Sequence, residues 1–276
     1  MKLVSFRHRN TDQAAILLED RILPLAGSMK EVISNPKLLR SPMEALPLEA
    51  VQLLAPIPHP DQDIICMGMN YTGHAEEAFS YSKQAFSSDR SVPVFFSKRA
   101  THCQGSGEAI LAHSDLTSCL DYETELAVVL GRDAQNVFEN EAEDYIFGYT
   151  IVNDVSARDL QTSHKQWYFG KSLDGFCPMG PCIVTRDEIS WPPALEIATF
   201  VNGELRQRSN TRLLIHGIAE IISTLSRGML LKAGTIIATG TPKGVAMGMK
   251  EPIFLKPGDT IINEIEGIGR LENYVV

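Results

Sequence analysis

Two glutamates with a single residue between them, Glu123 and Glu125, are the first candidates for chemistry in this sequence. They open an apolar run that ends at Leu130, and such a run predicts a largely buried strand. Side chains alternate between the two faces of a strand, so both carboxylates point the same way, and Asp121 is a further candidate at the strand entrance. Carboxylates crowded on a buried face require raised pKa values, neighbouring cations or a hard metal ion with oxygen ligands.

A metal site would need another carboxylate, and Asp154 is the best candidate because it follows a second apolar run at residues 145–152. Such an all-oxygen set suits Mg²⁺ or Mn²⁺, whereas the lack of a nearby His or Cys argues against zinc. The alternative is structural: Glu123 and Glu125 would line a solvated sheet edge, and Asp154 would cap a turn. Spacing alone leaves both interpretations open.

A histidine and a glutamate form a second candidate group. His74 and Glu77 stand three residues apart after a short strand, so they face each other if a helix begins just before them. The carboxylate would then fix the imidazole tautomer and leave the other ring nitrogen free as a base. The alternative is an ion pair on an exposed helix surface, which is common for so short a pattern.

Lys171 is the third candidate, because its surroundings are unusual for a charged side chain. It lies between Phe169 and Phe176 with glycines on both sides, which is a poor setting for a solvated ammonium. It could donate to an anionic substrate or to a developing enolate. The alternative is a lysine whose apolar stem packs on the aromatic rings while its ammonium reaches water.

The elements that hold these residues are mostly short apolar strands punctuated by glycine and proline. Asn202-Gly203 predicts a hairpin turn, and Thr211–Leu225 has the best helical periodicity. The regular strand–helix alternation of a doubly wound sheet is missing. Prolines crowded into residues 55–60 indicate an extended linker. We therefore predict an α+β, β-rich fold with a small β-containing N-terminal module at residues 1–58 and a main domain at residues 59–276.

Composition narrows the class of protein. The chain has 25 Lys+Arg against 34 Asp+Glu, a net charge of −9, which argues against nucleic acid or an anionic membrane as partner. No apolar run reaches the roughly 18 residues that a membrane span requires. The five cysteines are irregularly spaced and form no Cys-x-x-Cys pair, which favours a reducing compartment. We expect a cytoplasmic protein.

Eight short motifs, taken in order, make the sequence resemble the fumarylacetoacetate hydrolase family. They run from about residue 64 to the C-terminus and read G-M-N-Y-T-G-H-A-E-E, V-P-V-F-F-S-K, D-Y-E-T-E-L-A-V-V-L-G, G-Y-T-I-V-N-D-V-S-A-R-D-L-Q, G-K-S-L-D-G-F-C-P-M-G-P, V-N-G-E, A-T-G-T-P-K-G-V and F-L-K-P-G-D. The resemblance implies a β-roll built from a mixed sheet, a homodimer, and a divalent metal in the active site: Mg²⁺, Mn²⁺ or Ca²⁺.

The resemblance also implies roles for single residues. Glu123 and Glu125 match the E-x-E metal ligands of the family, and Asp154 matches the aspartate of its N-D-x-S-A-R-D motif. His74 and Glu77 match a dyad that smaller members carry on a lid segment. A fourth carboxylate ligand that one branch supplies has no match here, so water or substrate is expected to complete the metal shell.

Further matches concern the substrate. Lys171 matches the lysine of the G-K-S motif and is expected to be catalytic, whereas Gln161 and Thr241 match positions that contact substrate. One branch has a tyrosine four residues after the glutamine, but this chain has Lys165, so the substrate fumarylacetoacetate itself is not carried over. We expect the segment Gln161–Gly170 to select the substrate and the polar segment Ala78–Ser91 to form either a lid or a plain loop.

These matches imply an enzyme that handles small 2-oxo acids through an enolate stabilised by the metal. Hydrolysis of acylpyruvates and decarboxylation of oxaloacetate-like acids are the leading reactions. Keto–enol isomerisation of 2-hydroxyhepta-2,4-diene-1,7-dioate is the alternative, because all three reactions share the enolate. A metal-stabilised binding protein without turnover is the alternative from another class.

Overall fold

The structure is a computed structural model, and it describes residues 1–81 and 91–276. Strands dominate it, as predicted, and the helices are short. The strands are β1 (Lys2–His8), β2 (Thr11–Leu17), β3 (Arg21–Pro24), β4 (Leu46–Pro47), β5 (Gln52–Leu54), β6 (Ile64–Gly68), β7 (Val94–Lys98), β8 (Ala109–Ile110), β9 (Leu120–Asp121), β10 (Thr124–Leu130), β11 (Ile146–Asn153), β12 (Ser156–Ala157), β13 (Met179–Thr185), β14 (Glu196–Val201), β15 (Glu204–Asn210), β16 (Ile236–Ala238), β17 (Thr260–Ile265) and β18 (Gly269–Val275). The α-helices are α1 (Met29–Ser34), α2 (Thr72–Tyr81), α3 (Arg158–Ser163), α4 (Tyr168–Lys171) and α5 (Ile218–Ser226).

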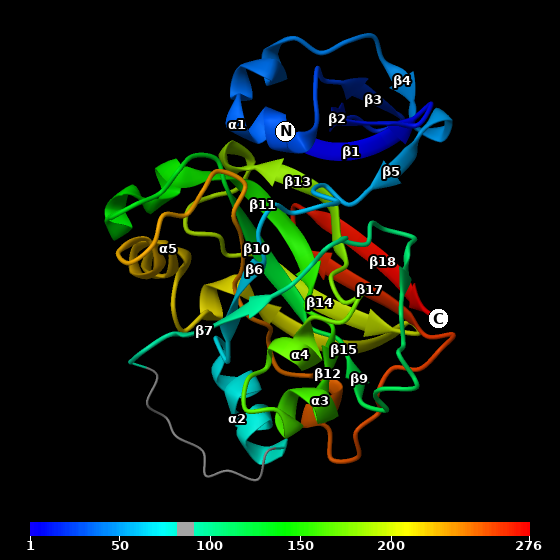
Figure 1. Cartoon of the computed structure of the whole chain (residues 1–276), viewed down its shortest axis with the longest axis vertical. Coiled ribbons are helices and arrows are strands. Elements are labelled where there is room, and N and C mark those ends of the chain that lie inside the picture. The colour runs from blue at the N-terminus through cyan, green and yellow to red at the C-terminus, as the bar shows by residue number, and fades with distance from the viewer. Residues whose placement is uncertain (82–90) are drawn as a thin grey trace.

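One large mixed sheet runs through the molecule in the order β4-β3-β2-β1-β13-β11-β10-β16-β6-β7, with β5 paired to β1. Its pairings are antiparallel around β10, β11 and β13, whereas β16 and β6 pair in parallel. The N-terminal strands lie at one end of the molecule (Figure 1), and β1 joins them to the rest through its ladder with β13. The predicted division between residues 58 and 59 stays a prediction.

A second sheet has the order β15-β14-β17-β18-β8 and packs against the central strands of the first. Its inward side chains, among them Ile197, Ile265 and Leu271, belong to the same buried cluster as Leu126 and Ile151 of the large sheet. Asn202-Gly203 forms the turn between β14 and β15, as predicted. The prediction of an α+β, β-rich roll is confirmed.

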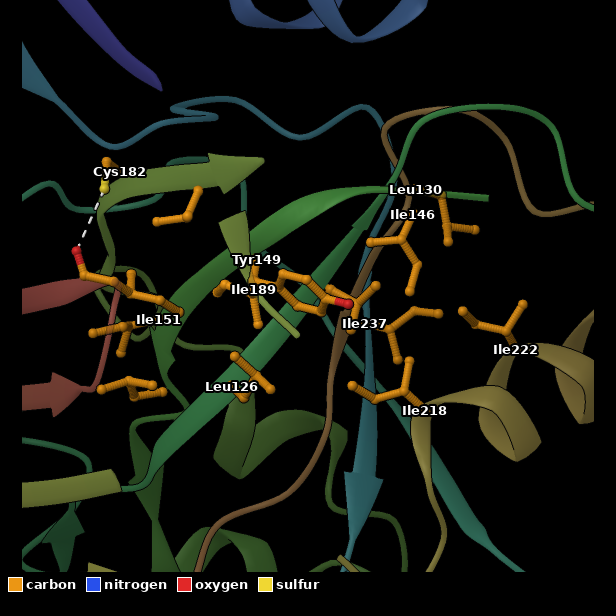
Figure 2. Packing of buried hydrophobic residues seen from close by; sticks show 14 of the residues in the cluster. Leu126, Leu130, Ile146, Tyr149, Ile151, Cys182, Ile189, Ile218, Ile222 and Ile237 are labelled. Atoms are coloured by element: carbon orange, nitrogen blue, oxygen red, sulfur yellow. Dashed lines mark hydrogen bonds between the residues drawn. The ribbon is translucent and has the colours of Figure 1, made fainter. Parts of the chain in front are cut away.

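Helix α5 covers another part of the large sheet. Its residues Ile218 and Ile222 point towards Leu130 and Ile237 (Figure 2). The periodicity predicted this helix from Thr211, which is wrong at its start. The main-chain N–H groups of residues 215 and 216 donate to the backbone and side-chain oxygens of Asn70, at 2.9 and 2.8 Å, so they cannot extend the helix. Within the described ranges, no helix has the length and apolar character needed to span a membrane.

Candidate active site

Strands β10 and β11 bring the predicted carboxylates together. They are antiparallel, with Thr124 opposite Asn153, and the Asp154 N–H donates to the Glu123 carbonyl at 2.8 Å. The Asn153 side-chain oxygen accepts from the Glu123 N–H at 2.9 Å, which fixes the chain between β9 and β10. Glu123, Glu125 and Asp154 each offer a carboxylate oxygen, and these oxygens lie within 4.8 Å of one another. All three residues are buried, so the solvated-edge alternative does not hold.

Three buried cations surround two of these carboxylates. Lys171 Nζ bridges Glu123 Oε2 at 2.8 Å and Asp154 Oδ2 at 2.7 Å. Arg158 Nη1 contacts Glu123 Oε1 at 2.6 Å, and Lys98 Nζ contacts Asp154 Oδ1 at 2.8 Å. Burial alone would raise the pKa of Glu123, but Lys171 and Arg158 hold it below its usual range. Glu123 is therefore an anion in this site.

Glu125 has a different environment. Its Oε2 accepts a hydrogen bond from the Gly240 N–H at 2.8 Å, and no cationic side chain of the described residues forms an ion pair with it. Burial raises the pKa of Glu125 well above its usual value, and the charges of Asp154 and Glu123 raise it further. A divalent cation within reach of all three carboxylates would remove this imbalance, so the donor set fits a hard metal ion.

Asp121 does not join this set. Its oxygens accept from the N–H groups of Ala246 and Met247 at 2.8 and 3.0 Å, and from Arg158 Nε at 2.8 Å. Asp121 therefore orients Arg158, whose guanidinium spans from Asp121 to Glu123. The planar fork of arginine suits this geometry, because separate N–H groups face the two carboxylates.

Helix α2 places the predicted dyad beside the carboxylates. His74 Nδ1 lies 3.6 Å from Glu77 Oε2, and His74 Nε2 lies 3.9 Å from Glu123 Oε1. The Gly244 N–H donates to both Glu77 oxygens, at 2.9 and 3.1 Å, which anchors that carboxylate. The imidazole thus lies between helix α2 and the carboxylates, and His74 is only 6% exposed. The exposed-ion-pair alternative is not what the structure shows.

The predicted substrate-contacting residues differ in what they offer. Gln161 Oε1 accepts from Arg158 Nη1 at 3.0 Å, and the side chain lines the cavity beside the carboxylates. Thr241 lines the same cavity, but its hydroxyl donates to the Thr124 carbonyl at 3.0 Å and accepts from Gln207 Nε2 at 2.9 Å. Its hydroxyl is therefore engaged within the protein, and the substrate contacts of both residues stay predictions.

Lys98 and Arg158 were not predicted as site residues, although both lie inside the motifs quoted above. Lys98 is fully buried, and its ammonium also donates to the main-chain carbonyls of Val155 and Lys171. It therefore fixes one metal-ligand candidate and the backbone of the catalytic-lysine candidate at once. A lysine at the end of an apolar strand is the signal that could have singled it out. The predicted lid, Ala78–Ser91, lies largely outside the described residues: its first four residues belong to α2.

Glu123 and Glu125 line a small cavity of about 30 Å³, together with His74 and Lys171. A much larger cavity, of about 500 Å³, lies on the face of the second sheet around Phe200 and Arg208. It contains none of the carboxylates, so size alone would point to the wrong place. The convergence of buried charge, rather than volume, identifies the candidate active site.

Comparison with known proteins agrees with the motifs. Residues 63–276 match the family described as fumarylacetoacetate (FAA) hydrolase C-terminal. Oxaloacetate tautomerase YisK of Bacillus subtilis (strain 168) is 48% identical over 228 residues, which cover 83% of this chain and 74% of that protein. Fumarylacetoacetate hydrolase from psychrophilic Exiguobacterium antarcticum has a similar structure, with a TM-score of 0.86 and 40% identity over 100% of this chain and 99% of that one. The 2-hydroxyhepta-2,4-diene-1,7-dioate isomerase from Mycobacterium marinum has a TM-score of 0.79 and 35% identity over 100% and 98% of the two chains.

Proposed function

Because this chain belongs to the fumarylacetoacetate hydrolase family, we propose that it is a divalent-metal-dependent enzyme that forms enolates of small 2-oxo acids. The observation that carries the proposal is the convergence of Glu123, Glu125 and Asp154 on one buried point beside Lys171. Glu123, Glu125 and Asp154 would hold the metal ion. Bound there, a Mg²⁺ or Mn²⁺ ion would supply Lewis-acid polarisation of the 2-oxo carbonyl.

The charge of the site favours an anionic substrate. Four buried carboxylates, those of the three candidate ligands and of Asp121, stand against the cations of Lys98, Lys171 and Arg158. With all four carboxylates ionised, a bound dication would change the local balance from one excess negative charge to one excess positive charge. Low dielectric strengthens this effect, so a carboxylate substrate is attracted and an enolate is stabilised.

Three side chains beside the carboxylates have separate roles in the proposed reaction: those of Lys171, Gln161 and His74. Lys171 offers an ammonium at the cluster, where it stabilises negative charge that develops on the substrate oxygen. Gln161 borders the cavity and orients the substrate carboxylate. His74, restrained by Glu77, moves a proton to or from the carbon next to the oxo group, or activates water in a hydrolysis.

Proton transfer at that carbon is the step that all candidate reactions share. Tautomerisation and isomerisation consist of this step, and the names of the Bacillus and Mycobacterium relatives describe reactions of this kind. Hydrolysis of acylpyruvates and decarboxylation of oxaloacetate-like acids add the cleavage of a C–C bond. We therefore place keto–enol conversion of a 2-oxo acid first and the cleavage reactions second.

Metal-stripped protein provides the test. Tautomerisation and decarboxylation of oxaloacetate and hydrolysis of acetylpyruvate are measured with and without Mg²⁺ or Mn²⁺, together with the melting temperature. Glu125→Gln, a substitution of nearly equal size, is expected to lose more than about 100-fold in activity and to lose metal-dependent stabilisation. Glu19→Gln, on an exposed turn, is the matched control and keeps both.

The outcomes separate the hypotheses. Metal-dependent turnover in the parent and in Glu19→Gln, but not in Glu125→Gln, supports the proposal. Turnover that is independent of metal, or that survives in Glu125→Gln, contradicts the ligand set. A metal-dependent rise in melting temperature without turnover of any 2-oxo acid or dienoate favours a binding protein.

A further inference from the structure

Strand β10 loses a neighbouring strand where it approaches the candidate metal ligands. On that side it pairs with β16, which ends just before Thr239, and the Thr239 N–H still donates to the Leu126 carbonyl at 3.0 Å. Alternate residues of an antiparallel strand direct their main-chain groups towards the same neighbour, so Thr124 faces the same side as Leu126. The N–H and C=O groups of Thr124, the residue between Glu123 and Glu125, therefore need other partners.

Two side chains take the place of the missing strand. Gln207 belongs to β15 in the second sheet, and its Oε1 accepts from the Thr124 N–H at 3.2 Å. The Thr241 hydroxyl donates to the Thr124 carbonyl at 3.0 Å and accepts from Gln207 Nε2 at 2.9 Å. These bonds form a closed ring, so the backbone between the two glutamates is held from the side of the second sheet.

Every hydrogen-bonding position of the Gln207 amide is used. Its Oε1 also accepts from the Thr199 hydroxyl at 2.6 Å, and its Nε2 also donates to the Pro242 carbonyl at 2.7 Å. A main-chain N–H can only donate and a carbonyl can only accept, so the amide cannot be turned over without breaking contacts on both sides. Gln207 is only 1% exposed, and a broken bond there is costly because bulk water cannot replace it.

The same amide fastens the loop at residues 240–244 to β15. That loop packs so closely on the strand that a Cβ added at Gly244 would lie 2.1 Å from the Arg206 carbonyl oxygen. The N–H groups at its two ends hold carboxylates of the site: the first donates to Glu125 at 2.8 Å, and the last donates to both oxygens of Glu77. The loop therefore fixes one candidate metal ligand relative to the histidine–glutamate dyad.

We propose that Gln207 is a positioning residue that holds Glu125 and the dyad in one arrangement. Gln207 is not among the described residues that line the cavity at the carboxylates, so it acts through Thr124 and the loop rather than on the substrate. The inference rests on the proposed function, because metal binding by Glu125 and proton transfer by the dyad belong to it. Without the amide, the loop is free to shift, and Glu125 and Glu77 lose the fixed positions of their N–H donors.

Gln207→Met removes the four hydrogen bonds of the amide at nearly constant size, and Asn273→Leu is the matched control. Asn273 lies on β18 of the same sheet, is 3% exposed, and donates to two main-chain carbonyls at 2.8 and 2.9 Å. Both substitutions take a buried amide from the second sheet, so both should lower the melting temperature. The dissociation constant for Mn²⁺ is measured by calorimetry, amide hydrogen exchange in the loop by mass spectrometry, and metal-dependent turnover of the 2-oxo acids by steady-state kinetics.

We expect Gln207→Met to bind Mn²⁺ about 10–100-fold more weakly and to lose turnover by a similar factor, as is typical when a residue that orients metal ligands is removed. Hydrogen exchange in the loop should be faster than in the parent even without metal. Asn273→Leu should keep the loop exchange, the Mn²⁺ affinity and the turnover of the parent, although its melting temperature falls.

Thr199→Val decides the question if Gln207→Met does not fold, because it removes one donor and leaves the contact with Thr124 in place. It should change Mn²⁺ affinity and loop exchange in the same direction by a smaller factor. Affinity and exchange like those of the parent in the deciding variant overturn the positioning role, while metal-dependent turnover of the parent upholds the proposed function. An equal loss of Mn²⁺ affinity in Asn273→Leu also overturns the role, since general destabilisation then explains it. A parent that neither binds Mn²⁺ nor turns over a 2-oxo acid overturns the proposed function and the inference together.

Discussion

Replacing Lys171 by methionine should affect metal binding and catalysis in opposite directions. The ammonium lies 2.8 Å from Glu123 Oε2 and 2.7 Å from Asp154 Oδ2, so it contacts two of the three carboxylates that would hold a metal ion. Without metal, Lys171→Met leaves buried carboxylates with less countercharge. Removing one partner of a buried ion pair costs about 3–5 kcal/mol. We expect the lower end of that range, because Glu123 keeps Arg158 and Asp154 keeps Lys98.

The loss of about 3 kcal/mol corresponds to a fall of roughly 6–12 °C in the melting temperature of the metal-free protein. Metal binding should become tighter, since the dication no longer meets an ammonium. Two unit charges about 4 Å apart interact by about 4 kcal/mol at an effective dielectric constant of about 20. Relaxation of the site absorbs part of this, so we expect a dissociation constant for Mn²⁺ at least about tenfold lower. Turnover should fall about 10²–10³-fold, as when one donor to a developing anion is removed.

The measurements are calorimetric titration with Mn²⁺, thermal unfolding with and without metal, and steady-state kinetics. Lys232→Met is the matched control, because Lys232 Nζ pairs with Asp133 at 2.7 Å on the surface. The control should keep the stability, metal affinity and activity of the parent. Metal binding that is weakened tenfold in Lys171→Met would show that the ammonium assembles the ligands rather than competing with the metal. Activity close to that of the parent would remove Lys171 from the chemistry.

Two other substitutions test how the site is positioned. Arg158→Lys replaces a planar guanidinium, which contacts both Glu123 and Asp121, by a single ammonium that cannot reach both carboxylates. We expect kcat/KM to fall at least about tenfold and the melting temperature to drop. Kinetics like those of the parent would show that the guanidinium is not needed. Gly248→Ala adds a Cβ 2.3 Å from Glu77 Cδ and should displace that carboxylate, lowering turnover while Mn²⁺ affinity stays unchanged. Gly228→Ala, where a Cβ meets open space, is the control for that pair of measurements.

Local patterns predicted the parts of the site that lie on single elements. Strand alternation placed Glu123 and Glu125 on one side, and the three-residue spacing placed His74 and Glu77 face to face. Asp154 could be found because it ends an apolar strand. Each of these inferences needed only neighbours along the chain, together with the knowledge that buried charges must be compensated.

The cations could not be predicted in the same way, because their partners are remote in sequence. Lys98 meets Asp154 across 56 positions, and Arg158 meets Asp121 across 37. No local period reveals that two such segments adjoin. The start of α5 was missed for a similar reason: Asn70, 146 positions before His216, takes the N–H group that would have begun the helix earlier. Tertiary contacts overrode the local pattern in each case.

The ladder between β1 and β13 limits how far the protein can be dissected. Lys2 pairs with Val184 and Leu3 with Ile183, and Ser5 Oγ donates to the Pro56 carbonyl at 2.7 Å. A chain that started at residue 59 would leave β13 with a bare row of N–H and C=O groups along one side. Such a border invites pairing with a foreign strand. The N-terminal strands therefore cover the edge of the sheet that carries the carboxylates. We expect a protein without them to self-associate through the exposed edge of β13.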